Sequence, residues 1–221
     1  MSDLPPFAQL AVAPDARLDL LGLAMAQEFR PVDAGGAVAM LDALGAELAQ
    51  SVAGTDGHPE DVASACTQLL GVRYGFRGER EDYDNPDNSM LDLVLARRRG
   101  LPILLSVIYI EVARRVGIPV LGVGLPGHFV VGHFESDPPL LLDPFNGGRV
   151  LREHFPDEQL RPWRPPEIAL RMLNNLVAAY ARRGNLTDAI RAARMRLALP
   201  AASTLRTALQ GELRALQARL N

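Results

Sequence analysis

The sequence predicts an α+β protein in which a buried central helix packs on a small antiparallel sheet. Three observations predict it: helical spacing of apolar residues at both ends of the chain, a segment after Pro102 that is apolar on nearly every side, and short β-rich runs after Gly117. We divide the chain into an N-terminal helical region (1–75), a core (76–160) and a helical tail (161–221).

The N-terminal region shows three apolar stripes with the i, i+3, i+4 spacing of amphipathic helices. The first lies between Asp15 and Phe29 and stops at Pro31. The second and third stripes are Val38, Leu41, Leu44 and Leu48, and, behind Pro59, Val62, Ala65, Leu69 and Val72.

A polar loop, residues 76–88, opens the core region. Its aspartates resemble a calcium loop, but the glycine and the bidentate glutamate of an EF-hand are missing, so a structured turn is the better interpretation. A helix is expected to begin at Asn88 or Ser89, both good caps, and to end within Arg97–Gly100, where arginines complement the helix dipole.

The central helix begins at Pro102, because proline suits the first helical position, and ends at Arg114-Arg115-Val116-Gly117. β-rich runs separated by turns then predict the strands of the sheet. These runs are 118–123, 129–134, 139–143 and 149–151.

The tail carries the spacing of one tetratricopeptide helix pair, in Leu176, Tyr180, Gly184, Ala189 and Ile190. A single repeat cannot bury its own apolar face, so we expect the tail to dock on the rest of the protein.

Composition excludes several classes of chemistry. The 221 residues are 48% hydrophobic, which is typical of a globular protein. All 23 basic residues are arginine, so lysine Schiff bases and P-loops are absent, and the single cysteine, Cys66, excludes an internal disulfide. No cofactor is expected.

The start of the chain lacks the charged and apolar pattern of a signal peptide, and the most apolar run, 101–110, is shorter than the roughly 20 residues that span a bilayer. We therefore expect a cytoplasmic protein with no membrane partner.

Charge is distributed unevenly. Residues 1–160 carry 12 arginines and 23 acidic residues, a net charge of −11, whereas residues 161–221 carry 11 arginines and three acidic residues, a net charge of +8. The favoured interpretation is that the basic tail packs against the acidic body. A phosphate-bearing or acidic partner of the tail is the alternative.

Candidate chemistry centres on His128, at the start of one predicted strand, and Asp143, at the end of the next. Adjacent antiparallel strands bring such residues side by side, and a histidine oriented by an acid is half of a nucleophilic triad. His128 and His133 are an odd number apart in a strand, and His128 with Asp143 offers only two ligands, so no metal site is predicted.

These residues resemble the transglutaminase-like superfamily, through Gly117-Ile118-Pro119, Gly127-His128 and Asp143-Pro144. The resemblance implies a papain-like core, and it places the catalytic cysteine position of that superfamily at Pro102. The sequence is similar more specifically to the bacterial SirB-type branch, which adds tetratricopeptide-like helices after the core. Features of that branch stand at Tyr83, Asn88, 99–102, 125–129 and 143–148.

Proline has no nucleophile, so the thiol step of the superfamily cannot occur at Pro102. Cys66 lies on an apolar helical face and is expected to be inert, and Ser106, one turn beyond Pro102, more often bonds preceding carbonyls than attacks a substrate.

Two classes of function remain. The favoured one is a pseudoenzyme that binds a peptide or protein in the former active-site groove, with Tyr83, Asn88, Ser106, Phe129 and Asn146 as groove residues. The other is a hydrolase or acyltransferase in which His128 is the base, Asp143 orients it, and water or Ser106 is the nucleophile. Nucleic-acid binding by the arginine-rich tail is a third interpretation.

Overall fold

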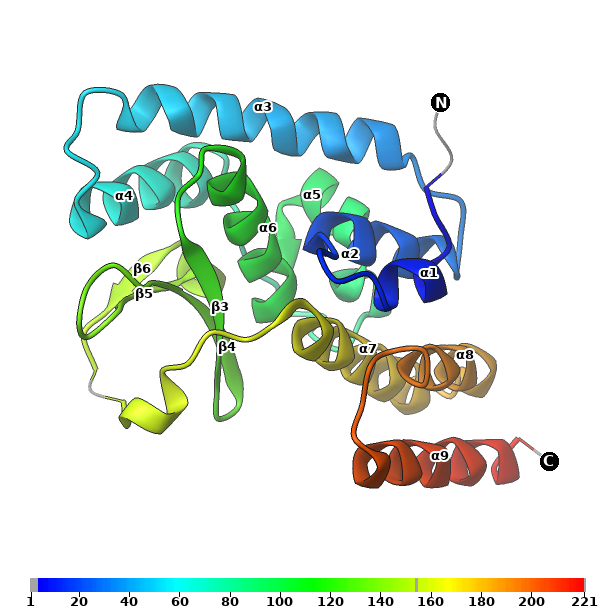
Figure 1. Cartoon of the computed structure of the whole chain (residues 1–221). Helices are drawn as coiled ribbons and strands as arrows, with labels where there is room; N and C mark the ends of the chain where they lie inside the picture. Colours follow the sequence, from blue (N-terminus) through cyan, green and yellow to red (C-terminus); the bar gives the residue numbers. More distant parts are fainter. Residues whose placement is uncertain (1–3, 154, 221) are drawn as a thin grey trace.

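Helix α6 (Pro102–Arg115) crosses the middle of the fold, as the computed structural model shows over residues 4–153 and 155–220 (Figure 1). Every residue of α6 from Pro102 to Ala113 is buried. The helix is covered by the sheet on one side and by N-terminal helices on another, and it also contacts the tail. The predicted mixed helix-and-sheet architecture with a buried central helix is confirmed.

The sheet has four antiparallel strands in the order β3-β4-β5-β6. They are β3 (Val120–Leu125), β4 (His128–His133), β5 (Leu140–Asp143) and β6 (Arg149–Leu151). The first strand begins two residues later than predicted, because Gly117 is left-handed and the Ile118 amide still bonds the Ala113 carbonyl of α6 at 3.0 Å.

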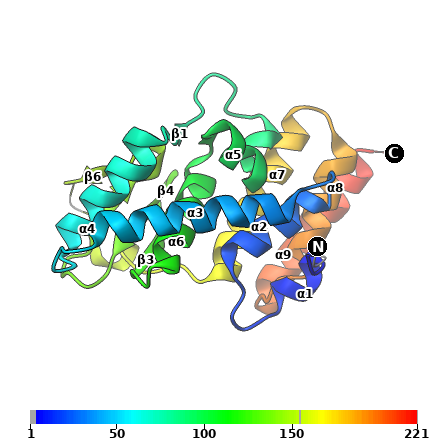
Figure 2. The ribbon, with the colours of Figure 1, turned by 90° about the horizontal axis from the view of Figure 1, so that it is seen from above.

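The N-terminal helices lie on the other side of α6. They are α1 (Phe7–Ala11), which the sequence did not reveal, α2 (Leu18–Gln27), α3 (Ala34–Val52) and α4 (Pro59–Cys66). Helices α2 and α3 contact α6, α1 packs on α2, and α4 packs on α3. Seen from above, α3 runs across most of the molecule over α6 (Figure 2). The predicted third helix is an α-helix only as far as Cys66, and it continues as a π-helix over Thr67–Arg73.

Helix α5 (Leu91–Arg97) starts later than predicted. Asn88 does not cap it, because its side-chain amide bonds the Asp82 carbonyl at 2.7 Å and so fixes the preceding loop. A short parallel pair, β1 (Arg77–Gly78) with β2 (Arg99–Gly100), ties this loop to the end of α5 and was not predicted.

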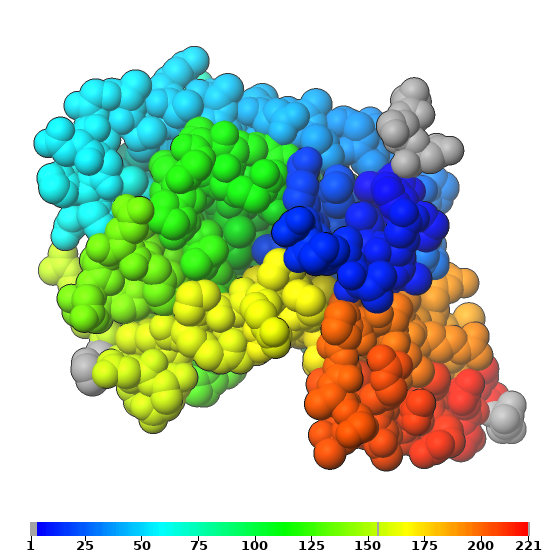
Figure 3. Space-filling model, in the orientation of Figure 1, coloured from blue at the N-terminus to red at the C-terminus, as the bar shows by residue number. Residues whose placement is uncertain are grey.

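The tail forms α7 (Pro165–Arg182), α8 (Leu186–Arg196) and α9 (Ser203–Ala218). One apolar cluster includes residues from all three segments of the chain, among them Met172 and Leu173 of α7. Helices α8 and α9 stand at a corner of the molecule next to the N-terminal segment (Figure 3). None of the helices in the described ranges has the length and apolarity that crossing a bilayer requires.

The tail also contacts the acidic loop of the body. Arg182 forms a 2.6 Å ion pair with Asp84, and Arg183 pairs with Asp82. Part of the opposite charge of the two segments is therefore matched within the chain.

A network of buried charges joins α2, α3 and α6. Asp19 is inaccessible to solvent and accepts hydrogen bonds from Arg17 at 2.6 Å and Arg115 at 2.7 Å. Arg115 also pairs with Glu111 and Asp42, while Glu111 accepts the Leu18 amide at the start of α2. Burial alone would raise the pKa of Asp19, but the hydrogen bonds from the two arginines hold it below its usual range.

We predict that Asp19→Asn destabilises the protein by about 3 kcal/mol at neutral pH, because it leaves Arg115 buried with less compensation. The folded-state pKa of Asp19 lies below the unfolded value of about 3.9, so its contribution is complete above that value and is lost as the pH falls through the folded-state pKa. Urea denaturation at pH 7 and at pH 3 measures both effects.

The matched control is Asp42→Asn, which removes an exposed partner of the same arginine and should cost less than about 1 kcal/mol. Equal losses for the two variants at pH 7 would contradict the role given to the buried carboxylate.

Candidate functional site

His128 and Asp143 meet at one end of the sheet. His128 is the first residue of β4 and Asp143 the last of β5, and the register Val131↔Leu142 brings these strand ends together. His128 Nε2 lies 3.0 Å from Asp143 Oδ1. The Asp143 side chain is buried, whereas 28% of the His128 side chain is exposed, so the imidazole is the accessible member of the pair.

Asp143 is held by the turn that follows it, the 3₁₀ segment Pro144–Asn146. Its Oδ1 accepts the backbone amides of Phe145 and Asn146, and its Oδ2 accepts the Asn146 side-chain amide at 2.6 Å. Burial acts to raise the pKa of Asp143, but the hydrogen bonds from His128 and Asn146 outweigh it and lower the pKa. The carboxylate is therefore ionised and can orient the imidazole.

Aromatic side chains surround the exposed edge of the pair. Phe145 packs edge-on against His128 with ring centroids 6.1 Å apart, and Tyr83 packs on Phe145 at 6.3 Å. Arg80 lies over the Phe145 ring at 5.0 Å, and its Nη2 donates to Asn146 Oδ1. The accessible surface beside the pair thus combines aromatic rings with a guanidinium group.

The tail contributes a residue that the sequence analysis missed. Arg171 of α7 donates to the His128 backbone carbonyl at 3.1 Å and lies 5.7 Å from both the Phe129 and the Trp163 ring centroids. Burial lowers the pKa of Arg171. Arg171, 43 residues from His128 in the sequence, thus joins the tail to the start of β4.

Ser106 lies in the second turn of α6, next to the start of β4. Its hydroxyl is fully buried and is 3.4 Å from the Phe129 carbonyl, which it donates to. Pro102, one turn earlier, is the first residue of the helix. This helix end therefore presents neither a thiol nor an accessible hydroxyl.

The five predicted groove residues differ in their exposure to solvent. Tyr83 and Asn146 are exposed. Asn88, Ser106 and Phe129 are nearly inaccessible to solvent, so a ligand on the surface would not touch their side chains.

Cys66 and His133 lie apart from the pair. Cys66 is enclosed in the core, and burial raises its pKa to about 12, as expected of an inert thiol. His133 is buried at the far end of β4, 3.9 Å from Glu135. No group of three or more His, Cys, Asp or Glu suited to a metal ion occurs within residues 4–153 and 155–220.

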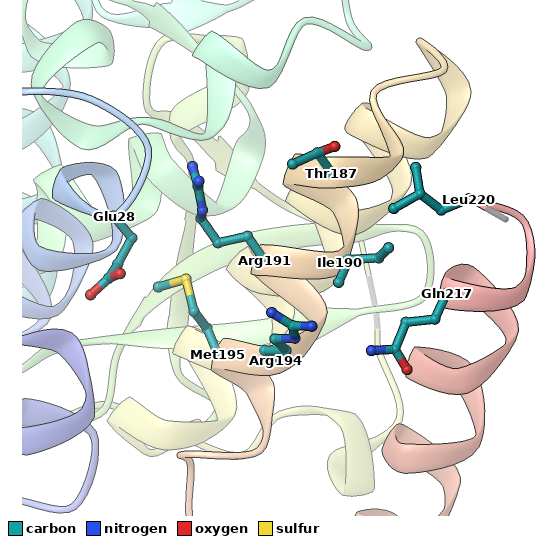
Figure 4. Close-up of a pocket in the computed structure, with 8 residues that line it drawn as sticks. All are labelled: Glu28, Thr187, Ile190, Arg191, Arg194, Met195, Gln217 and Leu220. Atoms are coloured by element: carbon teal, nitrogen blue, oxygen red, sulfur yellow. The ribbon is translucent and has the colours of Figure 1, made fainter.

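A groove of about 710 Å³ lies between α8, α9 and the end of α2 (Figure 4). Arg191 in this groove pairs with Asp188 at 2.9 Å, while Arg194 has no ion pair among the described residues. The nearby Arg196 is buried and paired with Glu212, so it is not available to an external ligand.

Comparison with known proteins decides the family. Residues 36–176 match the profile of the transglutaminase-like superfamily. A UPF0162 protein of Xylella fastidiosa strain 9a5c is 36% identical over 211 residues, which cover 86% of this chain and 75% of that protein. The chain belongs to the UPF0162 family of the transglutaminase-like superfamily.

Other similar proteins cover less of the chain. A UPF0162 protein of Pseudomonas aeruginosa is 33% identical over 151 residues, covering 60% of this chain and 55% of that protein. Human F-box only protein 21 is 35% identical over 85 residues, 38% of this chain and 14% of that one. No solved structure matches.

The superfamily match, 36–176, contains His128, Asp143 and the first two thirds of α7. The central helix α6, which begins with Pro102, also lies within the matching region.

We predict that Gly71→Ala destabilises the protein by about 1–3 kcal/mol or more, because its Cβ would lie 1.9 Å from the Gly147 carbonyl oxygen, a backbone atom that cannot rotate away. Gly211→Ala, in α9, meets nothing within 4 Å and should stabilise by about 0.5–1 kcal/mol. Thermal unfolding of both variants measures the difference, and a stable Gly71→Ala protein would contradict the close approach.

Proposed function

We propose that this protein is a SirB-type transglutaminase-like pseudoenzyme that binds a peptide or protein beside the His128–Asp143 pair. The observation that carries the proposal is the assembled pair, in which His128 Nε2 lies 3.0 Å from Asp143 Oδ1, in a fold whose central helix α6 begins with Pro102. The resemblance to the superfamily places the catalytic cysteine at this position. A site that keeps its orienting groups without a nucleophile is suited to binding rather than to acyl transfer.

The other side chains near α6 do not replace the thiol. Ser106 is buried and its hydroxyl is engaged, and Cys66 is a core thiol with a raised pKa. Both would have to leave the interior to meet a substrate. The binding function therefore requires no rearrangement of the fold, whereas thiol or hydroxyl catalysis does.

The surface beside the pair has properties that suit a peptide. His128 offers a partly exposed imidazole, and Tyr83 and Phe145 offer aromatic edges. Exposed aromatic groups beside a few fixed polar atoms are typical of binding sites.

We further propose that α7 and α8 form a tetratricopeptide-like pair that supports this surface. Leu176, Ala189 and Ile190 of the predicted spacing are buried, and Tyr180 stacks on Phe29 of the body at 5.3 Å. The groove between α8 and α9 would then be a second contact area for a protein partner (Figure 4).

A hydrolase or acyltransferase is the second candidate, favoured by the lowered pKa of Asp143 and its hydrogen bond to His128. In that mechanism His128 would activate a water molecule as general base and Asp143 would orient the imidazole.

Partner capture separates the two candidates. We predict that the wild-type chain retains a protein partner from a bacterial lysate, that His128→Ala loses it at least tenfold because the accessible polar group is gone, and that the retained partner keeps its intact mass. His58→Ala, at an exposed residue outside the site, is the control. Cleavage or acylation of the partner that depends on His128 would support the hydrolase and contradict the pseudoenzyme.

Restoring the thiol tests the site geometry. We predict that Pro102→Cys reacts with iodoacetamide faster than Cys66 does, although both positions are buried, because the N-terminus of α6 and an imidazole acting on it lower the pKa of the new thiol, whereas burial raises that of Cys66. The wild-type protein, whose Cys66 is buried, and the double variant Pro102→Cys/His128→Ala should react much more slowly. Equal rates for the single and double variants would show that position 102 and His128 do not interact.

A further inference from the structure

A cleft of about 520 Å³ opens directly beside the pair. One wall is the turn that holds Asp143, through Phe145, Asn146 and Gly147. The opposite wall is β1 with the loop after it, and β2 contributes Arg99. The cleft and the pair thus share the residues of one turn.

Three arginines line this cleft, Arg77, Arg80 and Arg99. None of them has a salt bridge among the described residues, although most other arginines of the body do, such as Arg17, Arg30 and Arg73. Arg77 is exposed and has no side-chain hydrogen bond there either, whereas Arg99 donates only to backbone carbonyls, those of Gly75 and Arg98.

The positive charges lie close enough to affect one another. Burial, together with the neighbouring charge of Arg77, lowers the pKa of Arg99. Like charges held in one cleft without an ion pair can be stabilised by an external anion, and guanidinium groups bind oxyanions in a bidentate manner.

The acidic residues of the cleft offset these arginines only in part, since Glu79 acts on Arg99 through its charge but forms no ion pair with it among the described residues. Glu79 turns to its own loop, where its Oε1 accepts the amides of Glu81 at 2.8 Å and Asp82 at 3.3 Å, and these bonds lower its pKa. Glu81 is exposed and forms no ion pair among the described residues.

A continuous chain of hydrogen bonds connects the cleft to the pair. Arg80 Nη2 donates to Asn146 Oδ1 at 2.5 Å, Asn146 Nδ2 donates to Asp143 Oδ2 at 2.6 Å, and Asp143 Oδ1 bonds His128. The side-chain amide of Asn146 thus accepts through its oxygen and donates through its nitrogen. A ligand group bound at Arg80 would therefore be connected to the imidazole through Asn146 and Asp143.

Two glycines of the cleft lie directly against the turn. A Cβ on Gly78 would lie 2.3 Å from the Phe145 ring, and one on Gly71 would meet the Gly147 backbone. The backbone therefore approaches the turn closely at these two positions.

We propose that this cleft binds carboxylate groups of an acidic peptide segment, which continues from it onto the surface beside His128. The proposal rests on the peptide-binding function above and names the chemistry of the partner. The guanidinium groups of Arg77, Arg80 and Arg99 and the side-chain amide of Asn146 can donate hydrogen bonds to carboxylates. Aspartate or glutamate side chains supply such carboxylates in a peptide.

The test uses the full chain and a fluorescein-labelled (Gly-Glu)₄ peptide, with (Gly-Gln)₄ as the neutral probe, in an anisotropy titration at low and physiological salt. We expect (Gly-Glu)₄ to bind at least tenfold more tightly than (Gly-Gln)₄. The double variant Arg77→Gln/Arg80→Gln should lose at least tenfold, whereas Arg214→Gln/Arg219→Gln, with the same change of net charge on the exposed tail, should lose less than twofold.

The single variant Arg77→Gln separates a loss of binding from a loss of folding, because the Arg77 side chain makes no hydrogen bond or ion pair among the described residues. This variant should fold like the wild type and weaken binding severalfold. Equal binding of both peptides, or equal losses in the cleft and tail variants, would overturn the proposal. Competition by inorganic phosphate well below the concentration at which free glutamate competes, or preferential binding of a single-stranded RNA oligonucleotide that depends on Arg77, would overturn it in favour of a phosphate ligand.

Failure here is distinguishable from failure of the proposed function. A lysate partner that is lost by His128→Ala but kept by Arg77→Gln/Arg80→Gln would leave peptide binding in place and remove only the carboxylate cleft.

Discussion

Helix α6 is buried from Pro102 to Ala113 and mostly apolar, and the other layers of the protein lie around it. The sheet, helices α2, α3 and α5 and the tail helix α7 each contact it. This constraint fixes where chemistry can occur. The ends of β4 and β5 are held against the first turns of α6, and the His128–Asp143 pair forms at the edge of that contact, where solvent can still reach the imidazole.

Ionised groups are buried at both ends of α6, and each is compensated by partners from distant elements. Asp19 and Glu111 are satisfied by arginines and by a backbone amide at the C-terminal end. At the other end Asp143 is satisfied by His128 and by its own turn. Because an uncompensated buried charge is costly, these networks fix how α2 and the sheet sit on the helix.

The UPF0162 chain pairs His128 with Asp143 at 3.0 Å, and its central helix begins with proline. The imidazole of this pair is partly exposed beside Phe145, whereas the carboxylate is buried. In our proposal the proline takes the place of the superfamily's nucleophile, so that an acyl-transfer site has become a recognition surface, whose positive cleft selects the partner by charge and whose imidazole contacts it.

The central helix, the four strands and the pairing of His128 with Asp143 could be predicted from the sequence, because these depend on local periodicity and on the adjacency of consecutive strands. Three contacts could be found only in the folded chain: Arg80 with Asn146, Arg171 with the His128 carbonyl, and Arg115 with Asp19, pairs separated by 66, 43 and 96 residues. The packing of the fold also buries Asn88, Ser106 and Phe129. Side-chain partners at such separations leave no periodic signal in the chain, since they are selected by how the layers pack and not by local conformation.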